Sequence, residues 1–443
     1  MKLTTMIFGA DALPDGNALA QAAEVLRGHQ QAGHALIAVI GALPGVYPLL
    51  YESTQLSNYS RVHNKLLSMH SSAARKLIYE AQDRGLLIQD VTDILETYNW
   101  MGRSMINRPP TPSEAATMLA VGERLSARLL AGHLQHKGIR AVHITDAIVT
   151  DENYLDATPD VAQTNERFTS KLVPLLEEGY IIIVSGALGI TAHGKPTRLK
   201  GHGIYLSGSV LAASGGADSL WFLTNQDGIL TADPELVPAA QTVPVLPASL
   251  LDDLAAHDID VPTSGDVDLA INAQIPMFIR NMLNPTHPGT YIQPTSDTPP
   301  DTLPVIVTRT NIRALSLPGA SLNPDDGIQA LAEENIQALV GHEPPDKLLF
   351  LLRADQANIA RLALSQAYPN SRIEASGDRS ALVTLIGTEP EAPTYLSRHL
   401  DPPVQALTLD SHGPQPHTAL LILEESVEAA VEKIHNLNLP QSK

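Results

Sequence analysis

Apolar residues follow two patterns along the first three hundred positions of the chain. Short runs such as 34–40 and 181–184 are almost uninterrupted, which predicts strands buried on both faces of a sheet. Longer segments repeat apolar residues at helical spacing. Strands that alternate with helices predict an α/β fold, in which a mostly parallel sheet carries helices on both faces. The other expected strands are 3–8, 141–144 and 219–223, and the expected helices are 18–29, 66–85, 90–105, 113–136 and 207–215.

The pattern changes near residue 284. Segment 284–304 is rich in Pro, Thr and Asp, which predicts a linker at 293–304 between a domain at 1–292 and a region at 305–443. In the last region, strands and helices follow a βαββαβ-like order, and a looser copy begins near residue 380. This order predicts two small ferredoxin-like modules. The strands are expected at 311–317, 336–341, 347–353, 381–386, 404–409 and 419–423, and the helices at 323–334, 356–367 and 427–436.

Composition narrows the class of partner. The 443 residues carry a net charge of -19, so a nucleic-acid backbone or an anionic membrane would be repelled, and we expect neither as a partner. The absence of cysteine excludes disulfides and thiolate metal sites. The N-terminus lacks the apolar core of a signal peptide, and the most apolar stretch, Ala35 to Leu50, is expected to form a buried strand and its exit loop. We therefore expect a cytoplasmic protein that binds a small molecule, such as an amino acid or a nucleotide.

Four stretches, in matching order and spacing, resemble signatures of the aspartokinases. The most specific, Leu223 to Pro234, is similar to the nucleotide loop T-D-V-D-G-V-x-T-A-D-P of that family. The resemblance covers the first three hundred residues. It implies an amino-acid-kinase domain followed by two ACT modules, through which family members form homodimers. The other three stretches are Gly122–Ala127, Val184–Gly189 followed by Thr197–Leu199, and Ile275–Thr290.

The resemblance also implies site residues and Mg-ATP as the cofactor. Plainer interpretations remain open, since a Glu on an amphipathic helix is usually solvated, an Asp-Gly pair is a common turn, and glycines satisfy turn geometry. The histidines show no metal-ligand spacing, so no metal site is predicted. The implied substrate-binding residues are Glu123, Ser185 and Gly186. The implied nucleotide-binding residues are Gly9, Thr224, Asp227, Gly228, Thr231 and Asp233.

The residues expected to carry phosphoryl transfer are replaced. Such a transfer depends on cations and dipoles held against the phosphates and the acceptor. Ile7 stands at the position of the family lysine, and Gly201 and Tyr205 stand where the family has its substrate-binding Arg and its Asp. Segment 260–265 carries no basic residue where the family has K-V-L-H-P-R. The sequence therefore identifies no catalytic residue.

Three functions follow from this pattern. The first is a non-catalytic or repurposed aspartokinase homologue that binds a small ligand or regulates amino-acid metabolism. The second is an active ATP-dependent kinase that forms an acyl phosphate on aspartate or another amino acid. In that case Lys195, Arg198, Lys200 or His202 would replace the lost cations. The third is a purely structural or assembly role.

Overall fold

The computed structural model divides the chain into two compact units. The first comprises Met1–Gly228 and Pro262–Pro294, and the second comprises Ile229–Val261 and Thr295–Lys443. The predicted domain limits at 292 and 305 stay predictions. The structure describes residues 2–56, 58–105, 108–294, 303–318, 322–334, 336–343, 347–376, 379–387, 400, 404–409 and 417–438. Most of the predicted linker lies outside these residues.

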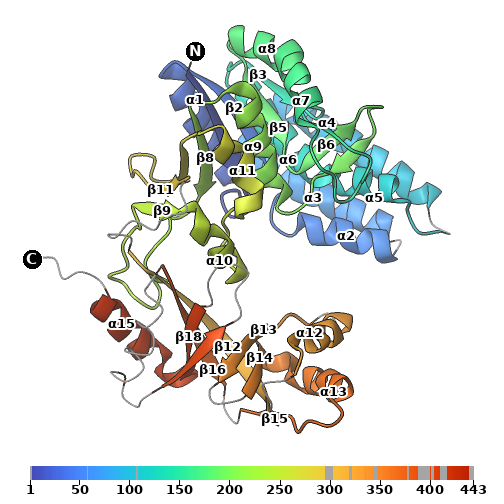
Figure 1. Ribbon diagram of the computed structural model, residues 1–443. Helices are drawn as coiled ribbons and strands as arrows, with labels where there is room; N and C mark the ends of the chain where they lie inside the picture. The colour runs from blue at the N-terminus through green and yellow to red at the C-terminus, as the bar shows by residue number, and fades with distance from the viewer. Residues whose placement is uncertain are drawn as a thin grey trace, which may run out of the picture. The chain divides into compact units, whose positions relative to one another are not determined.

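Most strands of the first unit form a central sheet, which confirms the predicted α/β fold (Figure 1). The order is β3–β5–β2–β1–β8–β10–β11, and every pair is parallel except β10 with β11. Strands β2 and β5, in the interior of the sheet, are almost wholly buried and apolar, as is usual in parallel sheets. Their bounds are β1 Lys2–Phe8, β2 His34–Ile40, β3 Ala141–Ile144, β5 Ile181–Ser185, β8 Ser219–Thr224, β10 Met277–Asn281 and β11 Thr290–Gln293.

Helices of the first unit cover the two faces of the sheet. Met6 and Phe8 point to one face, where they join an apolar cluster with α1, α3, α4 and α6. Ile7 lies between them in the strand, so its side chain points to the opposite face, where α9 packs. The helices are α1 Gly16–Gln31, α2 Val46–Leu56, α3 Tyr59–Leu77, α4 Ala81–Ser104, α5 Pro112–Leu119, α6 Val121–His136, α7 Val161–Arg167, α8 Val173–Glu177, α9 Gly203–Gly215 and α11 Ser264–Asn272.

Three predictions about helices were wrong. The helix expected at 113–136 is two helices, which meet at Ala120. The helix expected at 66–85 ends at Leu77, because Ile78 adopts an extended backbone. The exit loop expected up to Leu50 is present but ends earlier, because α2 begins at Val46; the helix tolerates Pro48 in its first turn, where backbone N–H groups need no helical partner.

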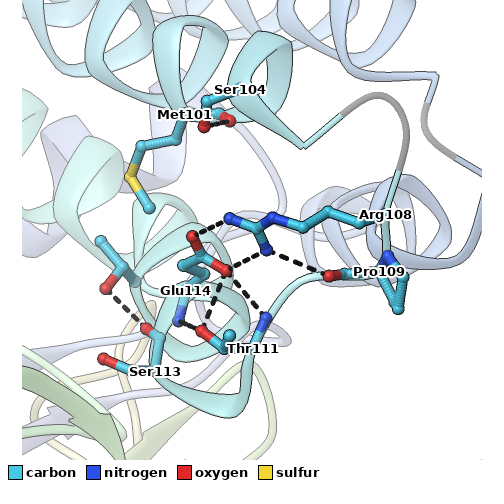
Figure 2. A network of polar contacts seen from close by, with 8 residues as sticks. Met101, Ser104, Arg108, Pro109, Thr111, Ser113 and Glu114 are labelled. Carbon is cyan, nitrogen blue, oxygen red and sulfur yellow. Dashed lines mark hydrogen bonds and ion pairs between the residues drawn. The ribbon is translucent and has the colours of Figure 1, made fainter.

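A polar network fixes the start of α5 (Figure 2). The Thr111 hydroxyl accepts a hydrogen bond from the backbone N–H of Glu114, and the Glu114 carboxylate accepts one from the backbone N–H of Thr111. Arg108 donates two further hydrogen bonds to this carboxylate, at 2.6 and 2.7 Å. The guanidinium of Arg108, together with the Thr111 donors, lowers the pKa of Glu114 to about 2. This capping box begins the helix pair that leads to Glu123.

A second, small sheet of the first unit was not predicted. It consists of β4 Val149–Thr150, β6 Leu188–Thr191 and β7 Pro196–Arg198, in the order β4–β6–β7. The β6–β7 pair is an antiparallel hairpin whose turn contains Gly194 with a positive φ of 78°. Its strands are only three or four residues long, too short for a clear alternating pattern. The hairpin places Arg198 beside Leu119 at the end of α5 and Glu123 in α6.

The second unit contains six antiparallel strands that pair in a closed circuit, β12–β14–β13–β17–β18–β16 and back to β12. Leu382 faces the inside of the circuit, whereas its neighbour Val383 packs outward in the cluster that includes α15. This antiparallel architecture agrees with the predicted ACT-like modules. The elements are β9 Val245–Pro247, α10 Leu251–Ala256, β12 Val305–Pro318, α12 Pro324–Glu333, β13 Leu339–Glu343, β14 Lys347–Arg353, α13 Ala357–Ala367, β15 Glu374–Ala375, β16 Ser380–Ile386, β17 Gln405–Leu409, β18 His417–Leu423 and α15 Val427–Asn438.

Candidate functional site

The carboxyl ends of the parallel strands bring several predicted site residues to one edge of the first sheet. Gly9 directly follows β1, Gly186 follows β5, and Ser185 and Thr224 end β5 and β8. In open α/β sheets, ligands bind at this edge. The predicted residues of the first unit therefore lie where a site would be expected, and the surrounding side chains decide what such a site can hold.

Ile7 is fully buried against α9. Its exposed fraction is 0%, and a methyl group added at Gly208 of α9 would overlap its Cδ1. Only a glycine at 208 leaves room for this side chain. The position that the resemblance assigns to a phosphate-binding lysine is thus part of the apolar packing between strand and helix. A lysine there would place a charge in this interior, which is costly without a partner.

Ile204 covers two glycines that follow neighbouring strands. Its side chain lies where added methyl groups at Gly41 and Gly186 would come within 3.0 and 2.8 Å of it. The backbone N–H groups of both glycines are also used, because Gly41 donates to Phe8 O at 3.0 Å and Gly186 donates to Ile40 O at 2.8 Å. Glycine loops at strand ends bind phosphates through free N–H groups. Here these two N–H groups are already bonded and an apolar side chain lies over them.

Tyr205, at the position of the family Asp, is buried in α9. It is 7% exposed, and its ring packs edge-on against Phe222, with 5.7 Å between the ring centroids. The next turn is held by Ser207, whose hydroxyl accepts a hydrogen bond from Ala187 N at 2.9 Å and donates one to Gly203 O at 2.8 Å. Ala187 adopts a left-handed φ of 58°, which is unusual for a residue other than glycine. These contacts fix the start of α9 against the loop after β5.

A buried ion pair joins Glu123 to Arg198. Glu123 lies in the first turn of α6, where the helix dipole favours a carboxylate. Arg198 Nη1 lies 3.2 Å from Glu123 Oε1, and the two side chains are 13% and 7% exposed. The same Nη1 donates to Leu119 O, and the guanidinium lies 4.9 Å from the centre of the Tyr47 ring. The predicted substrate-binding Glu123 therefore has an internal cation as its partner, while its buried Oε2 has no hydrogen-bond partner among the residues that the structure describes.

Ser185 is paired with a histidine that the motif analysis did not include. The Ser185 hydroxyl lies 2.8 Å from His143 Nε2, which comes from the neighbouring strand β3. Burial, followed by the positive charges of Arg124 and Arg128, lowers the pKa of His143 to about 4. The imidazole is therefore neutral at pH 7 and serves as a hydrogen-bond partner of the serine. The two residues meet because β3 pairs with β5, and this pairing is not visible in the sequence.

Two of the four predicted replacement cations have carboxylate partners. Arg198 is paired with Glu123, as described above. His202 lies before α9, and its Nδ1 is 3.1 Å from Asp266 Oδ2 at the start of α11. Despite its burial, hydrogen bonds from His202 and Thr263 hold the pKa of Asp266 below its usual value. Lys195 and Lys200 are exposed.

The Asp227–Gly228 turn is held by residues of the stretch Ile275–Thr290. Asn281 donates to Asp227 Oδ1 at 2.8 Å, and Asn284 donates to both carboxylate oxygens at 3.2 Å. Gly228 has a φ of 99°, and an added methyl group would lie 2.5 Å from Thr290 Oγ1. Both features maintain the shape of the loop. The structure thus brings two motifs together that are fifty residues apart in the sequence.

Thr231 and Asp233 belong to the second unit rather than the first. Thr231 is 1% exposed, and its hydroxyl lies 2.9 Å from His435 Nε2 of α15. Its backbone carbonyl accepts a hydrogen bond from Ile306 N at 2.9 Å. Asp233 is exposed and accepts a hydrogen bond from Glu235 N at 2.9 Å. These two predicted nucleotide-binding residues therefore take part in the folding of the second unit.

Two further features concern the described part of the chain as a whole. Within those residues, no group of three or more His, Asp or Glu side chains is arranged to hold a metal ion. None of the described helices is both long enough and apolar enough to cross a membrane.

Comparisons with known proteins agree with this architecture. Residues 6–281 match the model of the amino acid kinase family. The chain is 25% identical over 289 residues to the aspartokinase of Chlamydia muridarum and covers 62% of it, so the match spans less than two thirds of that relative. It is 24% identical over 348 residues to an aspartokinase of Thermus thermophilus, which amounts to 74% of this chain and 84% of the relative.

Solved structures share the fold over the whole chain. The E. coli aspartokinase III in complex with lysine and aspartate superposes with a TM-score of 0.83 at 19% identity, covering 99% of this chain and 100% of that one. The aspartate kinase of Clostridium acetobutylicum superposes with a TM-score of 0.73 at 16% identity, with 99% and 100% coverage. At these identities, the likeness establishes the fold.

Proposed function

We propose a function from the premise that this chain belongs to the amino acid kinase family, with aspartokinases among its relatives. The protein is a non-catalytic or repurposed homologue that binds a small ligand and acts in amino-acid metabolism without transferring phosphate. Two sets of contacts support this proposal, one at the strand ends where phosphates would bind and one around Glu123.

The packing of Ile7 is the main observation that supports the proposal. A triphosphate with its metal ion needs a cation and free N–H donors at the strand ends. Here Ile7 is packed against Gly208, and Ile204 covers Gly41 and Gly186. The residues present therefore do not fit a Mg-triphosphate in the manner that the resemblance implies, and no step through such a group is derived.

The Glu123–Arg198 pair supports the same proposal, because these residues would belong to the site for the amino acid that accepts the phosphoryl group. In a kinase for an amino acid, a buried carboxylate and a guanidinium in the substrate site would be available to a zwitterionic substrate. Here each is the partner of the other, and the Tyr47 ring lies over the guanidinium. A ligand that carries both charges would have to separate the pair first. Its affinity would be reduced by the cost of that separation.

The ligand and the assembly are also proposals. The E. coli aspartokinase III structure holds lysine and aspartate, and we extend to this chain a small amino-acid-like ligand. We further propose a homodimer formed through the ACT-like modules of the second unit. Light scattering of the purified chain tests this assembly, since a monomer at micromolar concentration would contradict it.

An active kinase is the second candidate, favoured by the intact Asp227–Gly228 loop. A coupled assay of ADP release with Mg-ATP and aspartate separates the two candidates. The proposal expects no release above that of ATP alone. Release that disappears in Lys200→Ala or His202→Ala would establish a kinase with replacement cations and would overturn the proposal.

A further inference from the structure

The second unit contains a cavity of about 1040 Å³ at the end of strand β14. Leu351, Leu352 and Arg353 line it, and Arg353 is the last residue of that strand. Across the sheet, Leu351 pairs with Leu339 of β13, and Arg353 pairs with Ile312 of β12. Every lining residue belongs to the second unit. The volume is at the upper end of the range for small-molecule sites.

The walls of the cavity are apolar and polar in about equal parts. Eleven of its seventeen lining residues are Ala, Ile or Leu, so a ligand that matches both parts has an apolar body and a polar head group. Helix α12 supplies Leu331 and Ala332, and α10 supplies Ala255 and Ala256. Ile328 is 45% exposed although it lines the cavity, so apolar surface here is left open to solvent.

The charged groups that line the cavity are two guanidiniums and one carboxylate, those of Arg309, Arg353 and Asp258. Arg309 is paired with Asp258, whose side chain is 72% exposed, whereas Arg309 is 24% exposed. An ion pair with one partner so exposed is weak, and a second carboxylate can replace the first at little cost. Arg353 is held by Asp355 through two hydrogen bonds, at 2.8 and 3.2 Å.

The backbone beside Arg309 is irregular. The pairing of β12 with β16 shifts register between Arg309 and Ile312, and Asn311 within this bulge has a φ of 58°. Asp258, on the opposite side of the ion pair, has a φ of 65°. Bulges redirect side chains, and left-handed backbone at residues other than glycine costs free energy. This cost falls on Asp258 itself and on Asn311, which lies two residues from Arg309.

We propose that this cavity binds a small amphipathic carboxylate. The apolar body lies along Ile328, Ala332 and Leu339, and the carboxylate pairs with Arg309 in place of Asp258. The proposal concerns the second unit alone, so it stands whether or not the first unit transfers phosphate.

Three probes with the same apolar chain and different head groups test the proposal. Octanoate, octanol and octylammonium are titrated into the full-length chain by calorimetry at neutral pH. Because a charge-assisted hydrogen bond to Arg309 is made only by the carboxylate, octanoate is expected to bind roughly tenfold to a hundredfold more tightly than octylammonium. Equal affinities of octanoate and octylammonium would overturn the proposal.

Two variants and a control locate the binding. Arg309→Gln is expected to weaken octanoate roughly tenfold or more, since it removes the charged partner. Ala332→Trp, at an exposed position of α12, is expected to abolish binding by filling the cavity without disturbing the core. Arg372→Gln, which removes an 85% exposed guanidinium elsewhere in the same unit, should leave the affinity unchanged. Octanoate binding that survives both Arg309→Gln and Ala332→Trp would place the ligand elsewhere and refute the proposal.

Discussion

Replacement of Arg198 by methionine tests whether Glu123 depends on this guanidinium. The substitution keeps the length of the apolar stem and removes the charge. It also removes the hydrogen bond to Leu119 O and the contact with the Tyr47 ring. Within the described part of the chain, Glu123 then keeps a buried carboxylate with neither oxygen paired, since its Oε2 already has no hydrogen-bond partner there.

The expected loss of stability is large. Side-chain exposures of 13% for Arg198 and 7% for Glu123 place the pair in a poorly solvated region. Removal of one partner of a buried ion pair costs about 3–5 kcal/mol, chiefly because the remaining charge is stranded. Replacement of both residues by methionine removes both charges, so the double variant should be more stable than the sum of the single losses predicts. We expect a coupling energy of about 2 kcal/mol.

Urea unfolding followed by tryptophan fluorescence measures this loss in the relevant unit. Both tryptophans, Trp100 and Trp221, lie in the first unit, so the signal reports that unit rather than the whole chain. The free energy of unfolding is compared for the natural chain, Arg198→Met, Glu123→Met and the double variant, which completes the cycle.

The exposed pair Arg27–Glu24 supplies the control. Its side chains are 46% and 51% exposed, so Arg27→Met should change stability by no more than about 1 kcal/mol. If Arg198→Met costs no more than this control, the carboxylate of Glu123 is satisfied by other means. The interpretation of the pair as internal partners would then be wrong.

Three further predictions concern the stability of the first unit, read from the same fluorescence. Burial lowers the pKa of His70 to about 4, so the folded state favours the neutral imidazole. The contribution of His70 to the free energy of unfolding is fully present above the unfolded pKa near 6.5, and up to about 3 kcal/mol is lost as the pH falls to 4. The variant His70→Met should lessen this loss. Thr111→Ala should lower the free energy of unfolding by about 1 kcal/mol, whereas Thr111→Ser, which keeps the cap of α5, should not. Gly228→Ala should cost about 1–3 kcal/mol, because φ is 99° and Thr290 leaves no room for a methyl group; an unchanged midpoint would contradict this.

Elements defined by a continuous apolar pattern were predictable from the sequence. Strand β2 was predicted at its observed limits, His34–Ile40, because all its residues after the first are apolar and buried. The helix break at Ala120 was not, since alanine favours helices and the nearby Gly122 lies inside the second helix. The β6–β7 hairpin was missed because its strands are too short for an alternating pattern to be recognised.

The candidate site was predictable in its residues and not in its contacts. Motif order identified Glu123 and Arg198 separately, but their pairing joins positions seventy-five residues apart and depends on the unpredicted hairpin. The same holds for Ser185 and His143, which meet only because β3 lies beside β5. The loss of the family lysine at Ile7 was visible in the sequence, whereas the covering of Gly41 and Gly186 by Ile204 required the structure.

Calorimetric titration of the full-length chain with Mg-ATP tests the central claim most directly. The claim is that Ile7 and Ile204 fill the region where a triphosphate would bind. The account predicts no saturable heat at nucleotide concentrations up to the millimolar range. A saturable one-to-one isotherm with micromolar affinity, lost when Mg²⁺ is withheld, would contradict it and would show that the nucleotide site survives without the lysine.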